Sequence, residues 1–295
     1  MPKTENSQWY VEQVADGEIH GHALTATLVQ GRSSFQEYAI VVSPLFGKML
    51  VLDGDTQSAA LDERIYHELL VHPACAARGS VKRALILGGA EGASLRELLK
   101  VPGMVKATMV DIDGIVVDAC RKHLPEWSDG AFDDPRSELI VGDAKAYVEN
   151  TNERFDVILG DLTEPLEDSP SYGLHTVSFY GKIRERLSPG GFYALQASMA
   201  GPHNHATHAR MIATLRAAFP SVAPYSTYVP AFDTEWGYAL CGDDVDALSD
   251  TAASAADAHA KACDLRCYDA QTHRRAFNLP RYLRDAYEKE TRIFE

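Results

Sequence analysis

The chain has 295 residues, of which 45% are hydrophobic and 24% charged, and its formal net charge at pH 7 is −14. A chain of this length buries one sizeable core and leaves room for a smaller second module. The negative charge argues against nucleic acid as the main partner, because phosphate binding requires a basic face. The same charge suits a cationic ligand, although it also serves ordinary solubility.

Two further features predict a soluble, cytoplasmic protein without a membrane partner. Residues 1–6 are polar and lack the apolar core of a signal peptide, and no stretch approaches the roughly 18 uncharged apolar residues of a membrane span. The five cysteines are far apart except for Cys263 and Cys267, and none forms a Cys-x-x-Cys pair. We therefore expect reduced thiols, with neither a disulfide framework nor a zinc knuckle.

Apolar and polar residues alternate from Trp9 to about Leu52. Turn residues interrupt the alternation at positions 16–17, 31–32, 44 and 47. This pattern predicts several antiparallel strands, and we place an N-terminal β-strand domain at residues 1–61. Residues 62–77 have helical spacing and are expected to form a connecting helix.

From Lys82 onward, short apolar strands alternate with helices. The predicted strands are 83–89, 107–113, 138–143, 155–161, 191–196, 222–228 and 236–241, and the predicted helices are 93–100, 115–124, 176–187 and 205–219. This alternation indicates an α/β fold with a parallel-rich, Rossmann-like sheet of the methyltransferase type, covered by helices on both faces. We expect this catalytic domain to span residues 62–295, with an Ala-rich acidic linker and further helices after position 243.

The ends of the predicted strands are unusually acidic. In open α/β sheets ligands lie beyond the carboxyl ends of the strands, and four such ends carry the carboxylates Glu91, Asp111, Asp143 and Asp161. The first strand ends in Gly-Gly-Ala-Glu-Gly at residues 88–92, which is not a dinucleotide fingerprint, and its glutamate would repel a pyrophosphate. The series therefore predicts a nucleoside pocket without a phosphate site.

Two of these carboxylates have expected partners in that pocket. Asp111 follows the first strand end by about twenty residues, the usual position of a carboxylate that accepts from ribose hydroxyls. Asp143 and Ala144 are placed to accept the adenine amino group, although Asp143 could equally cap the helix that follows it.

A family resemblance rests on ordered motifs from about Trp9 to the C-terminus. These motifs are Ser34-Phe35-Gln36, Leu52-Asp53-Gly54-Asp55-Thr56-Gln57, Asp62-Glu63-Arg64-Ile65-Tyr66-His67-Glu68, Gly88-Gly89-Ala90-Glu91-Gly92, Val110-Asp111-Ile112-Asp113, Gly142-Asp143-Ala144-Lys145-Ala146 and Gly160-Asp161-Leu162-Thr163-Glu164-Pro165, followed by Tyr172 and Ser178-Phe179-Tyr180. With these motifs the chain resembles the polyamine aminopropyltransferases, and within them the thermospermine synthases of the plant type more closely than the spermidine synthases. The closer likeness rests on three differences from spermidine synthases. Those enzymes usually have Asp in place of Glu91, Asp-Ser in place of Asp161-Leu162, and a Tyr that holds putrescine in place of Phe232. Trp236, which follows Phe232, adds to the likeness.

The resemblance implies transfer of an aminopropyl group from decarboxylated S-adenosylmethionine to a polyamine, spermidine giving thermospermine, with release of methylthioadenosine. The donor is a co-substrate, and no prosthetic group is implied. The implied donor residues are Gln36, His67, Gly88, Glu91, Asp111, Ile112, Asp143 and Ala144. The implied acceptor residues are Gln57, Tyr66, Asp161, Glu164, Gln196, Phe232 and Trp236, with Asp161 as catalytic base and Tyr66 orienting the amine. The resemblance also implies a homodimer or homotetramer.

Two departures from the family pattern concern the two substrates. Ala90 replaces a glycine that is usual in the turn, which tightens the approach of the donor. Glu164 replaces the usual Asp and adds one methylene beside the acceptor amine, so the acceptor stays open between spermidine and putrescine. Phe232 and Trp236 could pack against the acceptor or simply fill the core.

Other interpretations of the same residues are possible. A methyltransferase would have a similar sheet and nucleoside pocket, but Glu91 and the N-terminal strands argue against it. A catalytically idle polyamine-binding protein is a second alternative, against which Tyr66, Asp161 and Gln36 argue. His203, His205 and His208 lie at a helix start without a fitting carboxylate or cysteine, so we expect no metal site.

Overall fold

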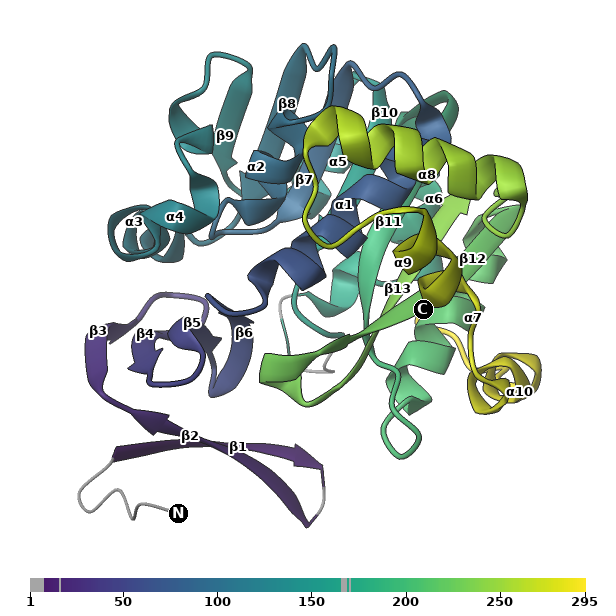
Figure 1. Ribbon diagram of the computed structural model, residues 1–295. Coiled ribbons are helices and arrows are strands. Elements are labelled where there is room, and N and C mark those ends of the chain that lie inside the picture. The colour runs from purple at the N-terminus through teal and green to yellow at the C-terminus, as the bar shows by residue number, and fades with distance from the viewer. Residues whose placement is uncertain (1–7, 16, 166–168, 170) are drawn as a thin grey trace.

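The computed structural model describes residues 8–15, 17–165, 169 and 171–295. The polar segment 1–6, for which no signal peptide is expected, lies outside the described residues. Within these ranges no helix is long and apolar enough to cross a membrane. Figure 1 shows the N-terminal strands beside a larger domain of strands and helices.

Two antiparallel sheets form the N-terminal part of the chain. One pairs β1 (Gln8–Ala15) with β2 (Glu18–Leu24), and the other has the order β3-β4-β5-β6. The four strands of the second sheet are β3 (Ala26–Arg32), β4 (Glu37–Ser43), β5 (Gly47–Leu52) and β6 (Asp55–Ala59). Gly17 and Gly54 occupy two of the turns with φ of 80° and 90°, a conformation that glycine adopts without a steric penalty. The predicted N-terminal antiparallel strands are confirmed.

Helix α1 (Glu63–Arg78) connects the two parts of the chain, as its spacing predicts. Every residue from Tyr66 to Ala76 is buried, including histidines and glutamates. A helix that is buried on all sides lies inside a protein, and its polar side chains must find partners there. Those partners form much of the site described below.

The larger domain is built on one seven-stranded sheet with the order β12-β13-β11-β10-β7-β8-β9. Its strands are β7 (Arg83–Gly88), β8 (Lys106–Asp111), β9 (Ser137–Val141), β10 (Phe155–Asp161), β11 (Leu187–Met199), β12 (Ser221–Val229) and β13 (Thr234–Gly242). The strands β7 to β11 run parallel, and β13 is antiparallel to both of its neighbours. The predicted Rossmann-like sheet is therefore confirmed.

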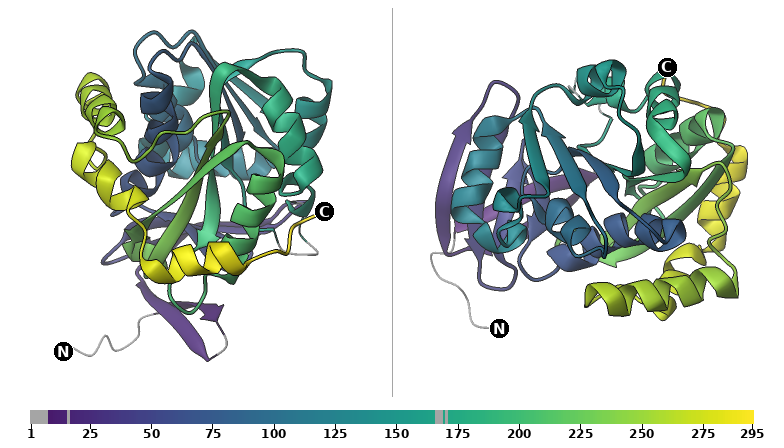
Figure 2. Two further views of the ribbon diagram at one scale, coloured as in Figure 1. Left: turned by 90° about the vertical axis from the view of Figure 1, so that its right-hand side faces the viewer. Right: turned by 90° about the horizontal axis from the view of Figure 1, so that it is seen from above.

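Helices cover both faces of this sheet (Figures 1 and 2). They are α2 (Ala93–Leu99), α3 (Gly114–His123), α4 (Pro125–Ser128), α5 (Ala144–Asn150), α6 (Val177–Arg186), α7 (Ala206–Ala218), α8 (Asp250–Cys263), α9 (Ala270–Phe277) and α10 (Arg281–Lys289), with single 3₁₀ turns at Ala131–Asp133, Tyr172–Leu174 and Pro230–Phe232. Alternate residues of β7 divide between two apolar clusters. Ile86 belongs to the cluster on the α1 face, and Leu85 and Leu87 belong to the cluster on the face of α6 and α7.

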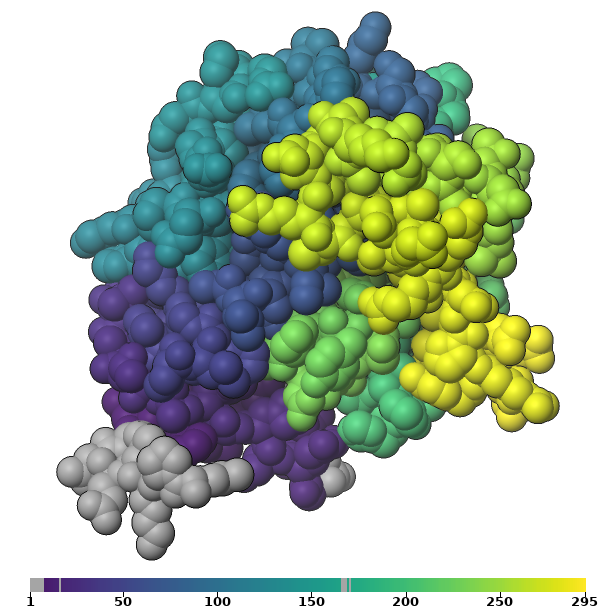
Figure 3. All heavy atoms as spheres, in the orientation of Figure 1, coloured from purple at the N-terminus to yellow at the C-terminus, as the bar shows by residue number. Residues whose placement is uncertain are grey.

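Two predicted boundaries differ from the structure. The predicted strand 191–196 begins earlier, at Leu187, because Leu187 already pairs with Phe155 before the register shifts. The Ala-rich stretch taken as a linker is helix α8, in which Ala253, Ala256 and Ala260 are buried. Small side chains allow α8 to pack closely on α1, and Figure 3 shows the C-terminal segment, in yellow-green and yellow, lying over the centre of the molecule.

Candidate active site

The candidate site lies where the strand order reverses, between β7 and β10, the usual ligand position in such sheets. Gly88 ends β7 and pairs with Asp161 at the end of β10. A Cβ atom on Gly88 would lie 2.2 Å from the Asp161 carbonyl oxygen, and the φ of Gly88 is 81°. Both facts require glycine here. The close approach places the carboxylate of Asp161 directly beside the turn after β7.

Asp161 is held by two hydroxyl groups from two helices. The Tyr66 hydroxyl in α1 donates to Oδ1 at 3.0 Å, and the Ser94 hydroxyl in α2 donates to Oδ2 at 2.6 Å. Burial and the charge of Glu91 raise the pKa of Asp161, while His67 and the two hydroxyls act against the rise. Burial and Asp161 hold the pKa of Tyr66 well above its usual range, so the phenol stays a donor. The result is a fixed carboxylate with an increased affinity for a proton.

Next to this pair lies a buried histidine between two glutamates. His67 Nε2 is 3.3 Å from Glu91 Oε1, and His67 Nδ1 is 2.6 Å from the Glu63 carbonyl oxygen and 3.2 Å from Glu63 Oε2. Burial lowers the pKa of His67, but Glu63 and Glu91 outweigh this effect and raise it to about 10. His67 is therefore an imidazolium at neutral pH, and it fixes Glu91 at the edge of the pocket.

Arg96 binds Glu63, the glutamate that pairs with His67. Its guanidinium donates to both Glu63 oxygens at 3.2 and 2.8 Å, to Glu97 Oε1 at 2.8 Å and to the Trp127 carbonyl oxygen at 2.6 Å. Burial raises the pKa of Glu63, but His67 and Arg96 outweigh this and lower it to about 2. Glu63 is therefore ionised at neutral pH.

The expected nucleoside residues lie at the ends of β8 and β9. Asp111 Oδ1 accepts from the Asp113 amide at 2.8 Å. Burial raises the pKa of Asp111 to about 6, with Glu91 adding to the rise and the Asp113 amide opposing it. Ile112 is 37% exposed and Ala144 is buried. Asp143 Oδ1 accepts from the Lys145 amide at 2.8 Å, so the helix-capping alternative is what the structure shows for this oxygen.

Gln36 reaches this edge from the N-terminal strands. Its Nε2 donates to Asp113 Oδ2 at 3.1 Å, and the Ser33 hydroxyl donates to the same oxygen at 2.5 Å. The other oxygen of Asp113 caps α3 through the amides of Ile115 and Val116, both at 3.2 Å. The loop between β3 and β4 is thereby tied to the start of α3, just after the end of β8.

Aromatic rings pack around Tyr66. The ring of Tyr66 lies 6.1 Å from that of Phe232 and 5.7 Å from that of Tyr238, and Phe232 lies 4.8 Å from Trp236. The indole nitrogen of Trp236 is buried and has no hydrogen-bond partner in the described part of the chain. The backbone amide of Ala231, next to Phe232, donates to Asp62 Oδ2 at 2.6 Å.

The remaining expected acceptor residues have mixed positions. The Ser198 hydroxyl donates to Glu164 Oε1, and burial raises the pKa of Glu164. Gln196 binds the backbone through both ends of its amide, to the Leu162 carbonyl oxygen at 2.5 Å and from the Ser198 amide at 2.9 Å. Gln196 therefore shapes the loop after β10. Gln57 donates to the Asp55 carbonyl oxygen at 3.1 Å and is half-buried.

Four residues that build this site were not predicted from the sequence: Asp62, Glu63, Ser94 and Arg96. Asp62 Oδ1 is buried and has no partner among the described residues, and burial raises the pKa of Asp62 to about 6. Asp62 and Glu63 lie in the same short motif as Tyr66 and His67, which was the available signal. Ser94 and Arg96 carry no such signal, because only the packing of α2 brings them near Asp161 and Glu63.

The three histidines at the start of α7 do not converge. His203 pairs with Glu18 at 2.9 Å, and His205 Nδ1 lies 2.9 Å from the Gly201 carbonyl oxygen. His208 lies between the Ala197 carbonyl oxygen at 2.6 Å and the Tyr287 hydroxyl at 2.7 Å.

Comparison with known proteins gives consistent results over nearly the whole chain. The spermine/spermidine synthase domain family matches residues 63–250, and the spermidine synthase tetramerisation domain family matches residues 8–59. A polyamine aminopropyltransferase of Sulfurisphaera tokodaii is 39% identical over 97% of this chain and 95% of its own length. One from Aeropyrum pernix is 40% identical over 96% and 92%.

Two solved structures have the same fold. A spermidine synthase in complex with the transition-state analogue AdoDATO is 26% identical, with a TM-score of 0.89 over 98% of this chain and 97% of the other. The spermidine synthase of Thermotoga maritima is 25% identical, with a TM-score of 0.87 over the same shares.

Proposed function

The chain belongs to the spermine/spermidine synthase family of polyamine aminopropyltransferases, and from this premise we propose how its site carries out the transfer. The donor is decarboxylated S-adenosylmethionine, and a polyamine nitrogen attacks the methylene carbon next to the sulfonium. The carbon–sulfur bond breaks, its electron pair stays on sulfur, and methylthioadenosine leaves. The amine proton passes to Asp161. The observation that carries this proposal is the Tyr66–Asp161–Ser94 group at the switch point of the sheet.

The donor lies along the ends of β7, β8 and β9 in this proposal. Its residues are Gln36, His67, Gly88, Glu91, Asp111, Ile112, Asp143 and Ala144. Glu91 attracts the ammonium of the donor tail and repels the additional carboxylate of ordinary S-adenosylmethionine. Opposite charges about 4 Å apart interact by roughly 4 kcal/mol at an effective dielectric of about 20, before desolvation. Because His67 already holds one oxygen of Glu91, only part of this energy reaches the donor.

The base must overcome the high proton affinity of the amine. Freeing an amine with an ordinary pKa near 10.4 costs about 4 kcal/mol at pH 7.5. Asp161 has a raised pKa and a fixed position, the two properties expected of a general base. Tyr66 holds the carboxylate in place and orients the amine.

The acceptor site comprises Gln57, Tyr66, Asp161, Glu164, Gln196, Phe232 and Trp236. We propose spermidine as the acceptor and thermospermine as the product, because Phe232 presents an apolar ring to the methylene chain of a longer amine. Spermidine synthesis from putrescine is the second candidate, and the likeness to two spermidine synthases favours it. The match of residues 8–59 to a tetramerisation domain supports a homotetramer, with the domain boundary near residue 61.

The activity is tested with the full-length chain and both donors. Binding of each donor is measured by calorimetry, and products with putrescine, spermidine and spermine are separated by chromatography. We expect tight binding of the decarboxylated donor, release of methylthioadenosine, and thermospermine as the main product. Tight binding of the full cofactor alone would overturn the proposal in favour of a methyltransferase. Binding without methylthioadenosine release in a single turnover would point to the idle polyamine-binding protein.

A further inference from the structure

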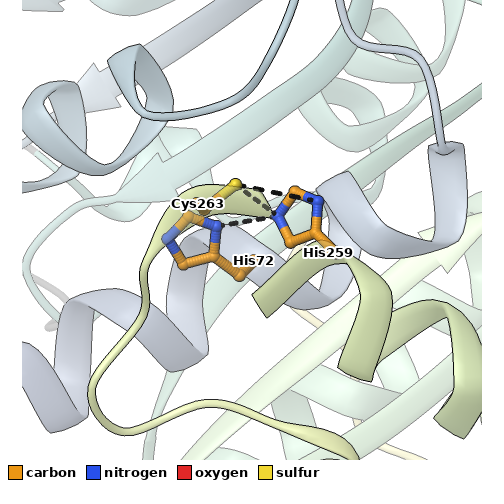
Figure 4. Close-up of side chains that lie close together, drawn as sticks. All are labelled: His72, His259 and Cys263. Carbon is orange, nitrogen blue, oxygen red and sulfur yellow. Dashed lines mark hydrogen bonds between the residues drawn. The ribbon is translucent and has the colours of Figure 1, made fainter. Parts of the chain in front are cut away.

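A cluster of metal-ligating side chains joins α1 to α8, away from the candidate active site. It consists of His72 in α1 with His259 and Cys263 in α8, and we refer to it as the histidine–cysteine cluster (Figure 4). His72 Nδ1 lies 3.0 Å from His259 Nε2, and Cys263 Sγ lies 3.6 Å from the same nitrogen. One ligand atom from each residue lies within 4.8 Å of the other two.

The two separations from His259 Nε2 are close to those of a tetrahedral zinc site, and the third pair of ligand atoms lies within 4.8 Å. With Zn–N bonds of about 2.0–2.1 Å and a Zn–S bond of about 2.3 Å, tetrahedral angles place two nitrogens about 3.3 Å apart and a nitrogen and a sulfur about 3.6 Å apart. The observed 3.0 and 3.6 Å require only small movements of the imidazole rings. His259 and Cys263 are four residues apart on one helix, so both side chains point to the same side.

The outer partner of His72 supports the same interpretation. His72 Nε2 lies 3.0 Å from Glu97 Oε2, so that nitrogen donates to the carboxylate, and neutral His72 then has its lone pair on Nδ1, which faces His259. A carboxylate that orients a ligating histidine in this way is the usual arrangement behind protein-bound zinc. Glu97 is itself fixed by Arg96 and by Lys100, at 2.8 and 2.6 Å.

The surroundings of the cluster exclude bulk water. His72 and Cys263 are 0% and 4% exposed, and His259 is the partly exposed member. The ring of Tyr268 stacks on His72 at 6.5 Å. A metal held here would be shielded from bulk water by the packing of α8 on α1.

We propose that His72 Nδ1, His259 Nε2 and Cys263 Sγ bind one Zn²⁺ ion per chain, with water at the fourth position. Two imidazoles and a thiolate favour zinc over the hard cations magnesium and calcium. Binding requires the thiolate, so the thiol proton of Cys263 is released to solvent. The ion would fasten α8 to the helix that carries Tyr66 and His67. Two of the three ligands follow residue 250, where the match to the synthase domain family ends.

The test uses the purified full-length chain, stripped with a chelator and reloaded with Zn²⁺ or Co²⁺ alone. We expect one equivalent of Zn²⁺ by elemental analysis after desalting, and a higher Tm in the loaded protein. Co²⁺ should give the absorption of a tetrahedral site together with a thiolate charge-transfer band. Wild-type protein that retains no zinc and gives no such band would overturn the proposal.

Variants identify the ligands. Cys263→Ser should abolish the charge-transfer band and weaken zinc binding at least tenfold, and His259→Ala should do the same without disturbing the buried face of α1. Cys267→Ser is the matched control, because Cys267 is a nearby cysteine outside the cluster. Zinc affinity that is the same in Cys263→Ser, His259→Ala and the control would show that the metal binds elsewhere, and would refute the site.

Discussion

Tyr66 and Asp161 are 95 positions apart in the chain, yet the Tyr66 hydroxyl donates to Asp161 Oδ1 at 3.0 Å. The two residues come from the buried helix α1 and from the end of β10, so their contact depends on the docking of that helix against the sheet. Ser94 occupies the other carboxylate oxygen at 2.6 Å. Asp161 therefore keeps its position before any substrate arrives.

Removal of this carboxylate should affect turnover more than donor binding. In Asp161→Asn we expect kcat to fall about 10²- to 10⁴-fold, the usual contribution of a general base. The Kd of the donor should change by less than about threefold, because Glu91 and Asp111 are untouched. Methylthioadenosine release and calorimetry measure the two quantities. Asp118→Asn, on the exposed side of α3, is the control. Turnover close to wild type would remove Asp161 from the mechanism.

Glu91 is expected to control the choice of donor. In Glu91→Gln the Kd of the decarboxylated donor should rise about 10- to 100-fold, because an attractive charge is lost from a low-dielectric pocket. The full cofactor should lose less, since its own carboxylate is no longer repelled. Calorimetry with both donors gives the ratio of the two affinities. An unchanged ratio would mean that another group discriminates between them.

Phe232 is expected to influence the acceptor. Phe232→Tyr adds a hydroxyl to the turn whose Ala231 amide binds the buried carboxylate of Asp62, and Asp62 Oδ1 has no partner among the described residues. A short diamine needs such a polar partner for its second ammonium. We expect the kcat/KM ratio of putrescine to spermidine to rise about tenfold or more, on the scale of one hydrogen bond. Competition assays with both amines measure this ratio. Phe35→Tyr, at an exposed phenylalanine, is the control and should leave the ratio unchanged.

The rate should increase with pH. An ordinary amine pKa near 10.4 means that the neutral nucleophile becomes about tenfold more abundant with each pH unit between 7 and 9. The raised pKa of Asp161 acts in the same direction, because the base is lost by protonation at low pH. Initial rates at saturating concentrations of both substrates should therefore rise from pH 7 toward pH 9. A flat profile between pH 7 and 10 would argue against rate-limiting attack by a neutral amine.

His67 should make stability depend on alkaline pH. Its pKa is raised to about 10 in the folded protein, against 6.5 for an ordinary histidine. The folded state thus binds an extra proton between these values, so the contribution of His67 to the free energy of unfolding is fully present below pH 6.5 and is lost as pH rises toward 10. The shift corresponds to at most about 5 kcal/mol.

Thermal or urea unfolding between pH 7 and 10 tests this dependence. His67→Gln should show a shallower decrease than wild type, and His203→Gln, at a histidine 56% exposed in its side chain, should follow wild type. Parallel curves for wild type and His67→Gln would show that His67 is neutral in the folded protein.

The sequence predicted the fold well because hydrophobic periodicity reports directly on strands and helices. It failed at residues 250–263, where three of the four buried residues of α8 are alanines and give little apolar contrast. The acidic residues predicted at strand ends do lie at or just after the ends of β7, β8, β9 and β10. The partners of those carboxylates could not be predicted, since Ser94 and Arg96 reach them only through the packing of α2. The histidine–cysteine cluster could not be predicted either, because His72 and His259 are 187 positions apart and only the packing of α8 on α1 brings them together.

Arg96 binds two glutamates with separate duties: Glu63 supports His67, and Glu97 supports His72. A change to either glutamate leaves a buried cation short of a counter-ion, which is a far larger penalty than the loss of one surface contact. Attempts to change donor preference through the residues that hold His67 should therefore replace Glu63 and Arg96 together. Single-site libraries at these positions would return mostly poorly folded proteins and few altered specificities.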